Sequence, residues 1–92
     1  MQVRWLRKAL RNLEQAHAYI AKDDPEAAIR TILKIQVAVD QLAQFPFMGR
    51  VGRVAGTREL VIINTPYFVI YGLTENTVEI LRVLHASRRY PA

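Results

Sequence analysis

The segment from His85 to Pro91 concentrates side chains that metal-free RNA cleavage would need. Attack by a 2′-hydroxyl requires a base, an acid for the leaving oxygen, and cations that hold the charge of the phosphorane. His85 can act as base or acid near neutral pH, Arg82 and Arg88 can stabilise charge, and Tyr90 can stack on a base or donate its hydroxyl to a phosphate. Each residue also has a plain structural interpretation: a strand-end histidine bonded to backbone, solvated terminal arginines (Arg88 and Arg89), and a tyrosine that pins the end of the chain.

A second group of arginines lies in a glycine-containing segment upstream. Arg50, Arg53 and Arg58 stand among Gly49, Gly52 and Gly56, an arrangement that suits either a phosphate clamp or an ordinary long connection. The segment is not a Walker loop, because no Gly-Lys-Ser/Thr follows. Glu59 offers a partner to a neighbouring arginine, and such a pair would leave less free positive charge.

Charge and composition bound the class of protein. The 92-residue chain carries 13 basic and 8 acidic side chains, a net charge of +5, which indicates a polyanionic partner: nucleic acid, an acidic protein segment, or both. From Pro46 onward every basic residue is arginine, which suits bidentate phosphate contacts but also fits a general bias in composition.

Length and residue usage exclude several other classes. The chain fits one domain, residues 1–92. It contains no cysteine, which excludes a disulfide scaffold, a thiolate zinc site and a cysteine nucleophile. No stretch has the length of a membrane span or of a signal-peptide apolar region, so we expect an unexported cytoplasmic protein. No His/Asp/Glu cluster has metal-ligand spacing, and we expect neither a metal nor a cofactor.

The first half of the chain is predicted to be a short strand and a helical hairpin. Val3–Trp5 can form the strand, and apolar residues at three- and four-residue steps predict helices over Lys8–Ala21 and Pro25–Gln44. Asp24 suits the N-cap of the second helix, and Pro25 suits its first position. Pro46 ends that helix.

The second half changes to a period of two. After a loop over Phe45–Thr57, we expect strands at Arg58–Ile63, Tyr67–Leu73 and Thr77–Leu84, with a tail over His85–Ala92. Short turns make these strands an antiparallel meander. The predicted fold is α+β in the order β-α-α-β-β-β, with the helical hairpin packed on one face of a small, mainly antiparallel sheet.

The alternation of the last strand separates two of the candidate residues. Because successive side chains of a strand point to opposite faces, Arg82 and His85 fall on opposite faces unless a bulge or the strand end intervenes. The spacing alone therefore does not place them in one site.

Over its whole length the chain resembles RelE/ParE toxins of bacterial type II toxin–antitoxin systems. The similarity rests on the order and spacing of five segments: Ala9-Leu10-Arg11-Asn12-Leu13 with Tyr19-Ile20 behind it, Phe45-Pro46-Phe47-Met48-Gly49-Arg50, Gly56-Thr57-Arg58-Glu59-Leu60, Tyr67-Phe68-Val69-Ile70-Tyr71, and Val78 through to Arg89. The predicted order of elements is also that of the superfamily fold.

The resemblance implies one of two activities. RelE-like members enter the ribosomal A site and cut mRNA; on this interpretation His85 matches the position where some carry a catalytic histidine. Arg82, Arg88 and Tyr90 would then stabilise charge, bind phosphate, and stack or transfer a proton. The remaining arginines would bind the RNA backbone or ribosomal RNA: Arg50, Arg53, Arg58 and Arg89.

ParE-like members instead poison DNA gyrase and are not known as nucleases. On that interpretation the helical hairpin and the arginine-rich tail would contact protein. The composition of the tail favours a ribosome-dependent mRNA endonuclease, although Ala86 stands near where the best-known nucleases carry a catalytic arginine, and arginines replace lysines of that pattern in the central loop. A nucleic-acid-binding domain without catalysis is a third possibility.

Either toxin activity implies a cognate antitoxin. Such partners usually contribute an acidic, partly disordered segment that folds on the toxin, and a basic surface with an exposed sheet face suits that mode of binding.

Overall fold

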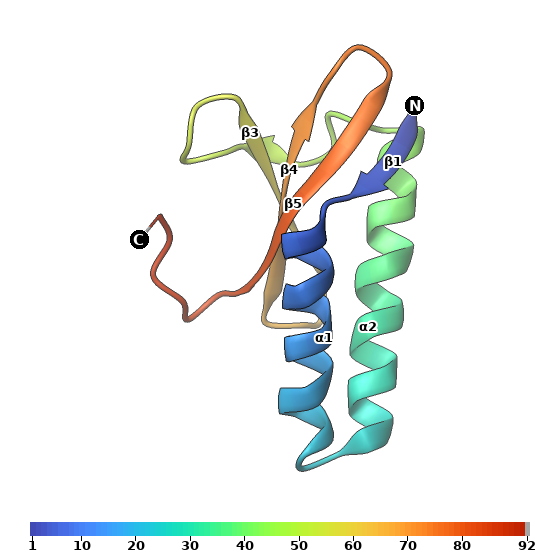
Figure 1. Ribbon diagram of the computed structural model, residues 1–92, viewed down its shortest axis with the longest axis vertical. Coiled ribbons are helices and arrows are strands. Elements are labelled where there is room, and N and C mark those ends of the chain that lie inside the picture. The colour runs from blue at the N-terminus through green and yellow to red at the C-terminus, as the bar shows by residue number, and fades with distance from the viewer. Residues whose placement is uncertain (92) are drawn as a thin grey trace.

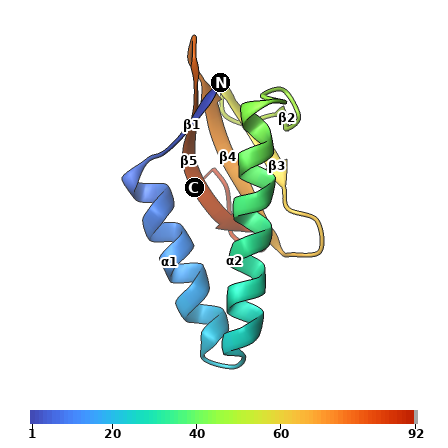
Figure 2. The same cartoon turned by 90° about the vertical axis from the view of Figure 1, so that its right-hand side faces the viewer.

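The computed structural model describes residues 1–91, and within them the fold has two layers. A helical hairpin, α1 (Arg7–Ala21) and α2 (Pro25–Asp40), covers one face of a sheet, and the turn of the hairpin projects beyond the strands (Figures 1 and 2). The strands are β1 (Gln2–Trp5), β2 (Arg50–Val51), β3 (Thr57–Val61), β4 (Tyr67–Leu73) and β5 (Thr77–His85). This arrangement confirms the predicted α+β class.

The sheet has the order β1-β5-β4-β3-β2 across the described residues. The neighbours β2, β3, β4 and β5 are antiparallel. Strand β1 runs parallel to β5, so the first and the last strand of the chain lie side by side. The meander of the second half is as expected. Within residues 1–91, neither α-helix combines the length and the apolar character needed to cross a membrane.

The sequence correctly marks the beginning of α2. The Asp24 carboxylate accepts a hydrogen bond of 3.0 Å from the amide of Ala27, and Pro25 occupies the first turn, where its missing N–H costs nothing. The predicted end of this helix was too late, because α2 stops at Asp40. A short 3₁₀ turn, η1 (Gln41–Ala43), follows and keeps Leu42 fully buried.

The predicted loop of Phe45–Thr57 contains a short strand, β2, that sequence reasoning missed. Arg50 and Val51 of β2 pair with Glu59 and Arg58 of β3. The strand that follows occupies Thr57–Val61 rather than Arg58–Ile63, and β5 extends one residue further than expected, through His85.

Two apolar clusters lie on opposite faces of the sheet. The larger fills the space between the hairpin and the sheet; its fully buried side chains include Ala9, Ile35, Val39, Leu42, Val69, Tyr71, Val78 and Ile80. The smaller cluster consists of Phe68, Ile70 and Leu84, with Leu81 and Tyr90 packed against it. We call the face that carries the smaller cluster the open face, because the helices cover the other one.

Candidate functional site

His85 ends β5 on the helix-covered side of the sheet. It pairs with Tyr67 of β4, whose ring meets the imidazole edge-to-face at 5.3 Å between centroids. The imidazole Nδ1 accepts the backbone N–H of Ser87 at 3.0 Å and lies 2.7 Å from the Ser87 hydroxyl oxygen. This pairing assigns the proton of the neutral ring to Nε2. The ring is therefore held in one orientation through Nδ1, and Nε2 is the nitrogen that can donate.

A small cleft of about 300 Å³ lies beside His85, between α1 and the ends of β4 and β5. Gln15 and Tyr19 line it from the helix, and Arg88 lines it from the tail. Tyr19 is 68% exposed, so it lies at the rim of this cleft. Among the predicted catalytic residues, the cleft brings together His85 and Arg88.

Arg82 does not join this cleft. A bulge leaves Leu81 without a partner on β4, because Ile70 pairs with Arg82 and the next residue, Tyr71, pairs with Ile80. From Arg82 to His85 the pairing is regular, so these two residues lie on opposite faces. Because the bulge precedes Arg82, it does not change how Arg82 and His85 are oriented relative to each other. The two residues lie on opposite faces, as the alternation of the strand predicts.

Asn12 of α1 fixes the position of Arg82 and was missed as a functional candidate. Its side-chain oxygen accepts the Arg82 Nε–H at 2.9 Å and the Val83 backbone N–H at 3.1 Å. Since β1 pairs with β5 only as far as Ile80, Asn12 supplies an acceptor where the neighbouring strand has ended. A signal was present in the sequence: Asn12 is three residues from Ala9, on the apolar stripe of the helix.

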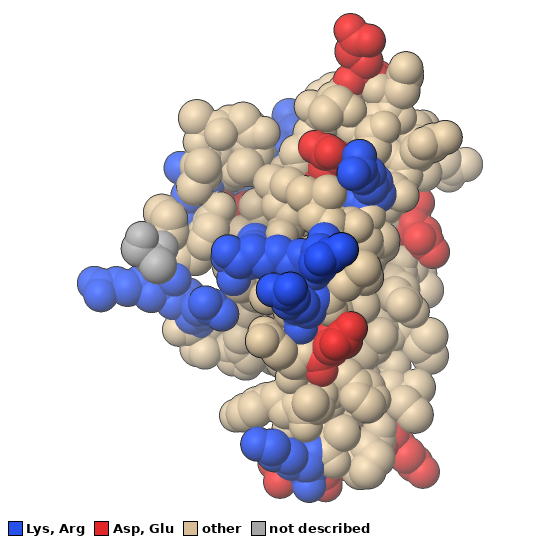
Figure 3. Space-filling view, viewed as in Figure 1, with Lys and Arg blue, Asp and Glu red and all other residues tan. Residues whose placement is uncertain are grey.

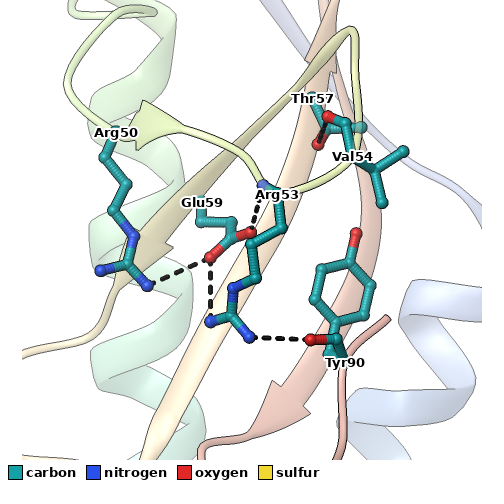
Figure 4. Close-up of polar contacts among 6 residues, drawn as sticks. All are labelled: Arg50, Arg53, Val54, Thr57, Glu59 and Tyr90. Carbon is teal, nitrogen blue, oxygen red and sulfur yellow. Dashed lines mark hydrogen bonds and ion pairs between the residues drawn. The ribbon is translucent and has the colours of Figure 1, made fainter. Parts of the chain in front are cut away.

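Arg50 and Arg53 converge on Glu59, whose side chain has 0% exposure (Figure 4). The carboxylate accepts hydrogen bonds from the Arg50 guanidinium at 3.1 Å and the Arg53 backbone N–H at 2.9 Å, and it forms an ion pair of 3.2 Å with the Arg53 guanidinium. Burial raises the pKa of the Glu59 carboxyl, but these hydrogen bonds and both positive charges together bring it below its ordinary value of 4.5. The expected pairing of Glu59 with an arginine is confirmed.

Tyr90 lies on the open face, on the other side of the sheet from the His85 cleft. Its ring meets Phe68 at 6.1 Å, and its backbone carbonyl accepts a hydrogen bond of 3.0 Å from the Arg53 guanidinium (Figure 4). That guanidinium also lies 5.3 Å from the Phe68 ring centroid and 5.5 Å from that of Tyr90. Tyr90 is thus anchored among apolar side chains, away from His85.

The central loop is fixed by side chains of the sheet. Arg58 donates to the Gly49 carbonyl at 2.7 Å and lies over the Phe47 ring at 4.9 Å. The Tyr71 hydroxyl donates to the Pro46 carbonyl at 2.8 Å and accepts the Gly49 N–H at 2.9 Å. These contacts favour an ordered connection over a mobile phosphate clamp.

Exposed basic side chains occur along much of the chain, and two groups of them stand out on one face. On the face shown in Figure 3, basic side chains gather over the beginning of α1, and a second group projects on the C-terminal side. The sequence interpretation concentrated on the second group, where Arg88 and Arg89 are exposed. It overlooked exposed basic residues at the other end of the chain, Arg4, Arg7, Lys8 and Arg11.

A larger and mostly apolar groove of about 540 Å³ runs between α2 and β3. Leu33 and Val37 line it from the helix, and Val61 and Ile63 line it from the sheet side. All four side chains are more than half exposed.

Among residues 1–91, no group of three His, Asp or Glu side chains is placed to hold a metal ion.

Comparisons with known proteins agree with this architecture. Residues 3–90 match the family model described as "ParE toxin of type II toxin-antitoxin system, parDE". "Putative toxin Y4kP" of Sinorhizobium fredii is 48% identical over 90 residues, covering 98% of this chain and 93% of that protein. "Toxin RelE2" of Caulobacter vibrioides is 39% identical over 87 residues, covering 95% of this chain and 97% of its own length.

A solved structure shares the fold. The structure titled "Chromosomal ParDE TA system from P. aeruginosa" superimposes with a TM-score of 0.82 at 26% identity, over 92% of this chain and 95% of the other. A helical hairpin on one face of a mainly antiparallel sheet, with a basic tail after the last strand, defines a small toxin of the RelE/ParE superfamily. Within it, the chain belongs to the ParE toxin family of type II toxin–antitoxin systems.

Proposed function

We propose that this chain acts in the bacterial cytoplasm and arrests growth by binding DNA gyrase, as a ParE-type toxin without nuclease activity. A cognate antitoxin neutralises it. One observation carries the choice of target. His85 and Tyr90, the two non-arginine members of the set predicted to cleave RNA, lie on opposite faces of the sheet. A general base and a general acid that act on one phosphate must both lie within hydrogen-bond reach of the protons that they transfer.

The surroundings of the other predicted residues support the same proposal. Arg50 and Arg53 share the charge of Glu59, and Arg82 is bonded through Nε to Asn12. On the open face Phe68, Ile70 and Leu84 are buried beside that carboxylate, with Leu81 and Tyr90 packed against them, so these side chains are not available to an RNA backbone. The match to the ParE family model favours gyrase as well.

The antitoxin proposed here is an acidic, partly disordered protein segment. The net charge of +5 favours an acidic partner. The chain also leaves large apolar side chains exposed, such as Val37 at 58%, Val61 at 55% and Ile63 at 79%, and a segment that folds on binding would cover such surface.

An mRNA endonuclease remains the alternative function, because His85 and Arg88 do share a cleft. One induction experiment separates the two. The chain is expressed alone in a bacterium, beside His85→Ala, and labelled thymidine and methionine incorporation are followed over the first minutes. On the gyrase proposal thymidine incorporation falls first, filaments form, and His85→Ala remains toxic. Methionine falling first with thymidine intact, together with loss of toxicity in His85→Ala, would establish the nuclease instead.

A further inference from the structure

Glu59 stands at the beginning of a chain of contacts that ends at the C-terminal tail. Its carboxylate is buried on the open face, where it shares a side of the sheet with Ile70, its partner on β4. A buried carboxylate is tolerated when it is hydrogen-bonded and paired with positive charge. Here Arg50 and the backbone of Arg53 donate hydrogen bonds to it, and the Arg53 guanidinium forms an ion pair with it.

Arg53 connects this carboxylate to the tail. Its Nη2 faces Glu59 at 3.2 Å, while its Nη1 donates to the Tyr90 carbonyl at 3.0 Å (Figure 4). The same guanidinium lies within 5.5 Å of the centroids of both the Phe68 and the Tyr90 rings. Within this set of contacts Glu59 supplies the negative charge, and its ion pair orients the fork of Arg53 toward Tyr90 alongside the contacts with the two rings.

The other end of the tail is anchored independently. The Ala86 N–H donates to the Pro66 carbonyl at 2.7 Å, and the Arg88 N–H donates to the His85 carbonyl at 2.9 Å. Arg89 lies between this anchor and Tyr90, and both Arg88 and Arg89 are exposed. The two arginines are therefore carried on a short segment that is tied down on each side.

We propose that Glu59, acting through Arg53, is a positioning residue that holds the tail against the open face and so presents Arg88 and Arg89 in one fixed arrangement to the protein target. We call the contacts of Glu59, Arg53 and Tyr90 the tail latch. The part of this proposal that concerns a target rests on the proposed function, whereas the latch itself is a property of the free chain. Fixing the tail beforehand removes the ordering cost that a mobile tail would add to every binding event.

The latch is tested by limited trypsin digestion of the full chain, with intact-mass detection of cleavage after Arg88 and Arg89. Glu59→Gln breaks the latch at its base. Tyr90→Ala removes the contacts of the Tyr90 ring with Phe68 and with the Arg53 guanidinium, while it leaves the backbone carbonyl and both Glu59 ion pairs in place. We expect each variant to be cut in the tail roughly tenfold faster than wild type, because cleavage follows the population of the released state. Tyr90→Phe keeps the ring and the carbonyl and should be cut at the wild-type rate.

Positioning is tested by growth arrest on induction, which presupposes no particular target, with protein levels matched by immunoblot. Glu59→Gln and Tyr90→Ala should both need several times more protein for the same arrest. Glu75→Gln serves as the control, because Glu75 is an exposed carboxylate in the turn between β4 and β5, outside the helical hairpin and the tail. Growth arrest by Tyr90→Ala is informative even if Glu59→Gln fails to fold.

The outcomes separate the claims. Folded Tyr90→Ala or Glu59→Gln protein cut at the wild-type rate would overturn the latch. A released tail with unchanged growth arrest would overturn the positioning role. If wild type arrests growth without affecting gyrase supercoiling in vitro, the proposed target is wrong, while the digestion and growth comparisons still decide the latch and the positioning role.

Discussion

Glu59 keeps a negative charge at a buried position because it accepts two hydrogen bonds and forms ion pairs with two arginines. Its pKa is lowered on folding, so the stability that it contributes is present above the unfolded-state value near 4.5 and is lost as pH falls through the lower folded-state pKa. Glu59→Gln should lower the free energy of unfolding at pH 7 by about 1–3 kcal/mol, a figure that allows for the half-exposed arginines.

The Glu59→Gln variant should also show a weaker dependence of the free energy of unfolding on pH below pH 7. Urea denaturation at pH 7 and at about pH 4 measures the difference, since a glutamine cannot titrate over this range. Glu26→Gln, which removes an exposed carboxylate, should follow the wild-type curve closely. Equal pH dependence in wild type and Glu59→Gln would contradict the charge state assigned to this carboxyl.

Asn12 offers a second prediction at this scale. Asn12→Leu leaves the Val83 N–H and the Arg82 Nε–H without their acceptor, and we expect a loss of about 1–3 kcal/mol in the free energy of unfolding. Asn12→Asp keeps an acceptor at the same place and should lose less. Gln15→Leu, an exposed change one helical turn away, is the control in the same urea titrations. A loss in Asn12→Leu no larger than in the control would show that the bond to the strand edge contributes nothing.

At the scale of the elements, the sequence predicts most of what local patterns govern. The apolar steps give both helices, Asp24 and Pro25 mark the beginning of α2, and Tyr67–Leu73 is predicted to the residue. The end of α2 was predicted too late, because Leu42 continues the apolar pattern through a 3₁₀ turn. Strand β2 was not predicted, because two residues in a glycine-containing loop are too few to show an alternating apolar pattern. Only their pairing with β3 makes them a strand.

The candidate site was less predictable, because its geometry depends on which face each residue meets. The residue types of the tail indicate only which chemistry they could perform. Nothing in Ser87, Arg88 or Arg89 indicates, however, that the chain crosses from the His85 cleft to the open face before Tyr90. The pairing of Glu59 was foreseen from its charged neighbours, while its continuation through Arg53 to Tyr90 is a tertiary contact across 37 residues of sequence.

The N-cap of α2 gives a prediction with a close control. Asp24→Ala removes the bond to the Ala27 amide and should lower the free energy of unfolding by about 0.5–2 kcal/mol. Asp23→Ala changes the same charge one residue earlier and should stay within about 0.5 kcal/mol of wild type. Thermal and urea unfolding of both variants measure the difference, and equal losses would mean that charge rather than capping stabilises the hairpin.

At the scale of the whole molecule, the excess of positive charge bears on how the toxin meets its antitoxin. A net charge of +5 on a chain of 92 residues attracts an acidic partner over distances longer than any single contact. Such attraction speeds the encounter, whereas the packing of apolar side chains after contact governs how slowly the complex comes apart. Charge and apolar surface therefore affect different rate constants.

Salt should separate these two contributions. Raising NaCl from about 50 mM to about 500 mM shortens the screening length several-fold, and we expect the association rate constant with the antitoxin to fall by roughly tenfold or more. The dissociation rate constant should change far less, because buried contacts are screened weakly. Stopped-flow association and surface-immobilised dissociation measure the two constants, with circular dichroism at each salt concentration to check that the fold is unchanged. An association rate that does not respond to salt would mean that the basic surface is directed at the target of the toxin and not at its inhibitor.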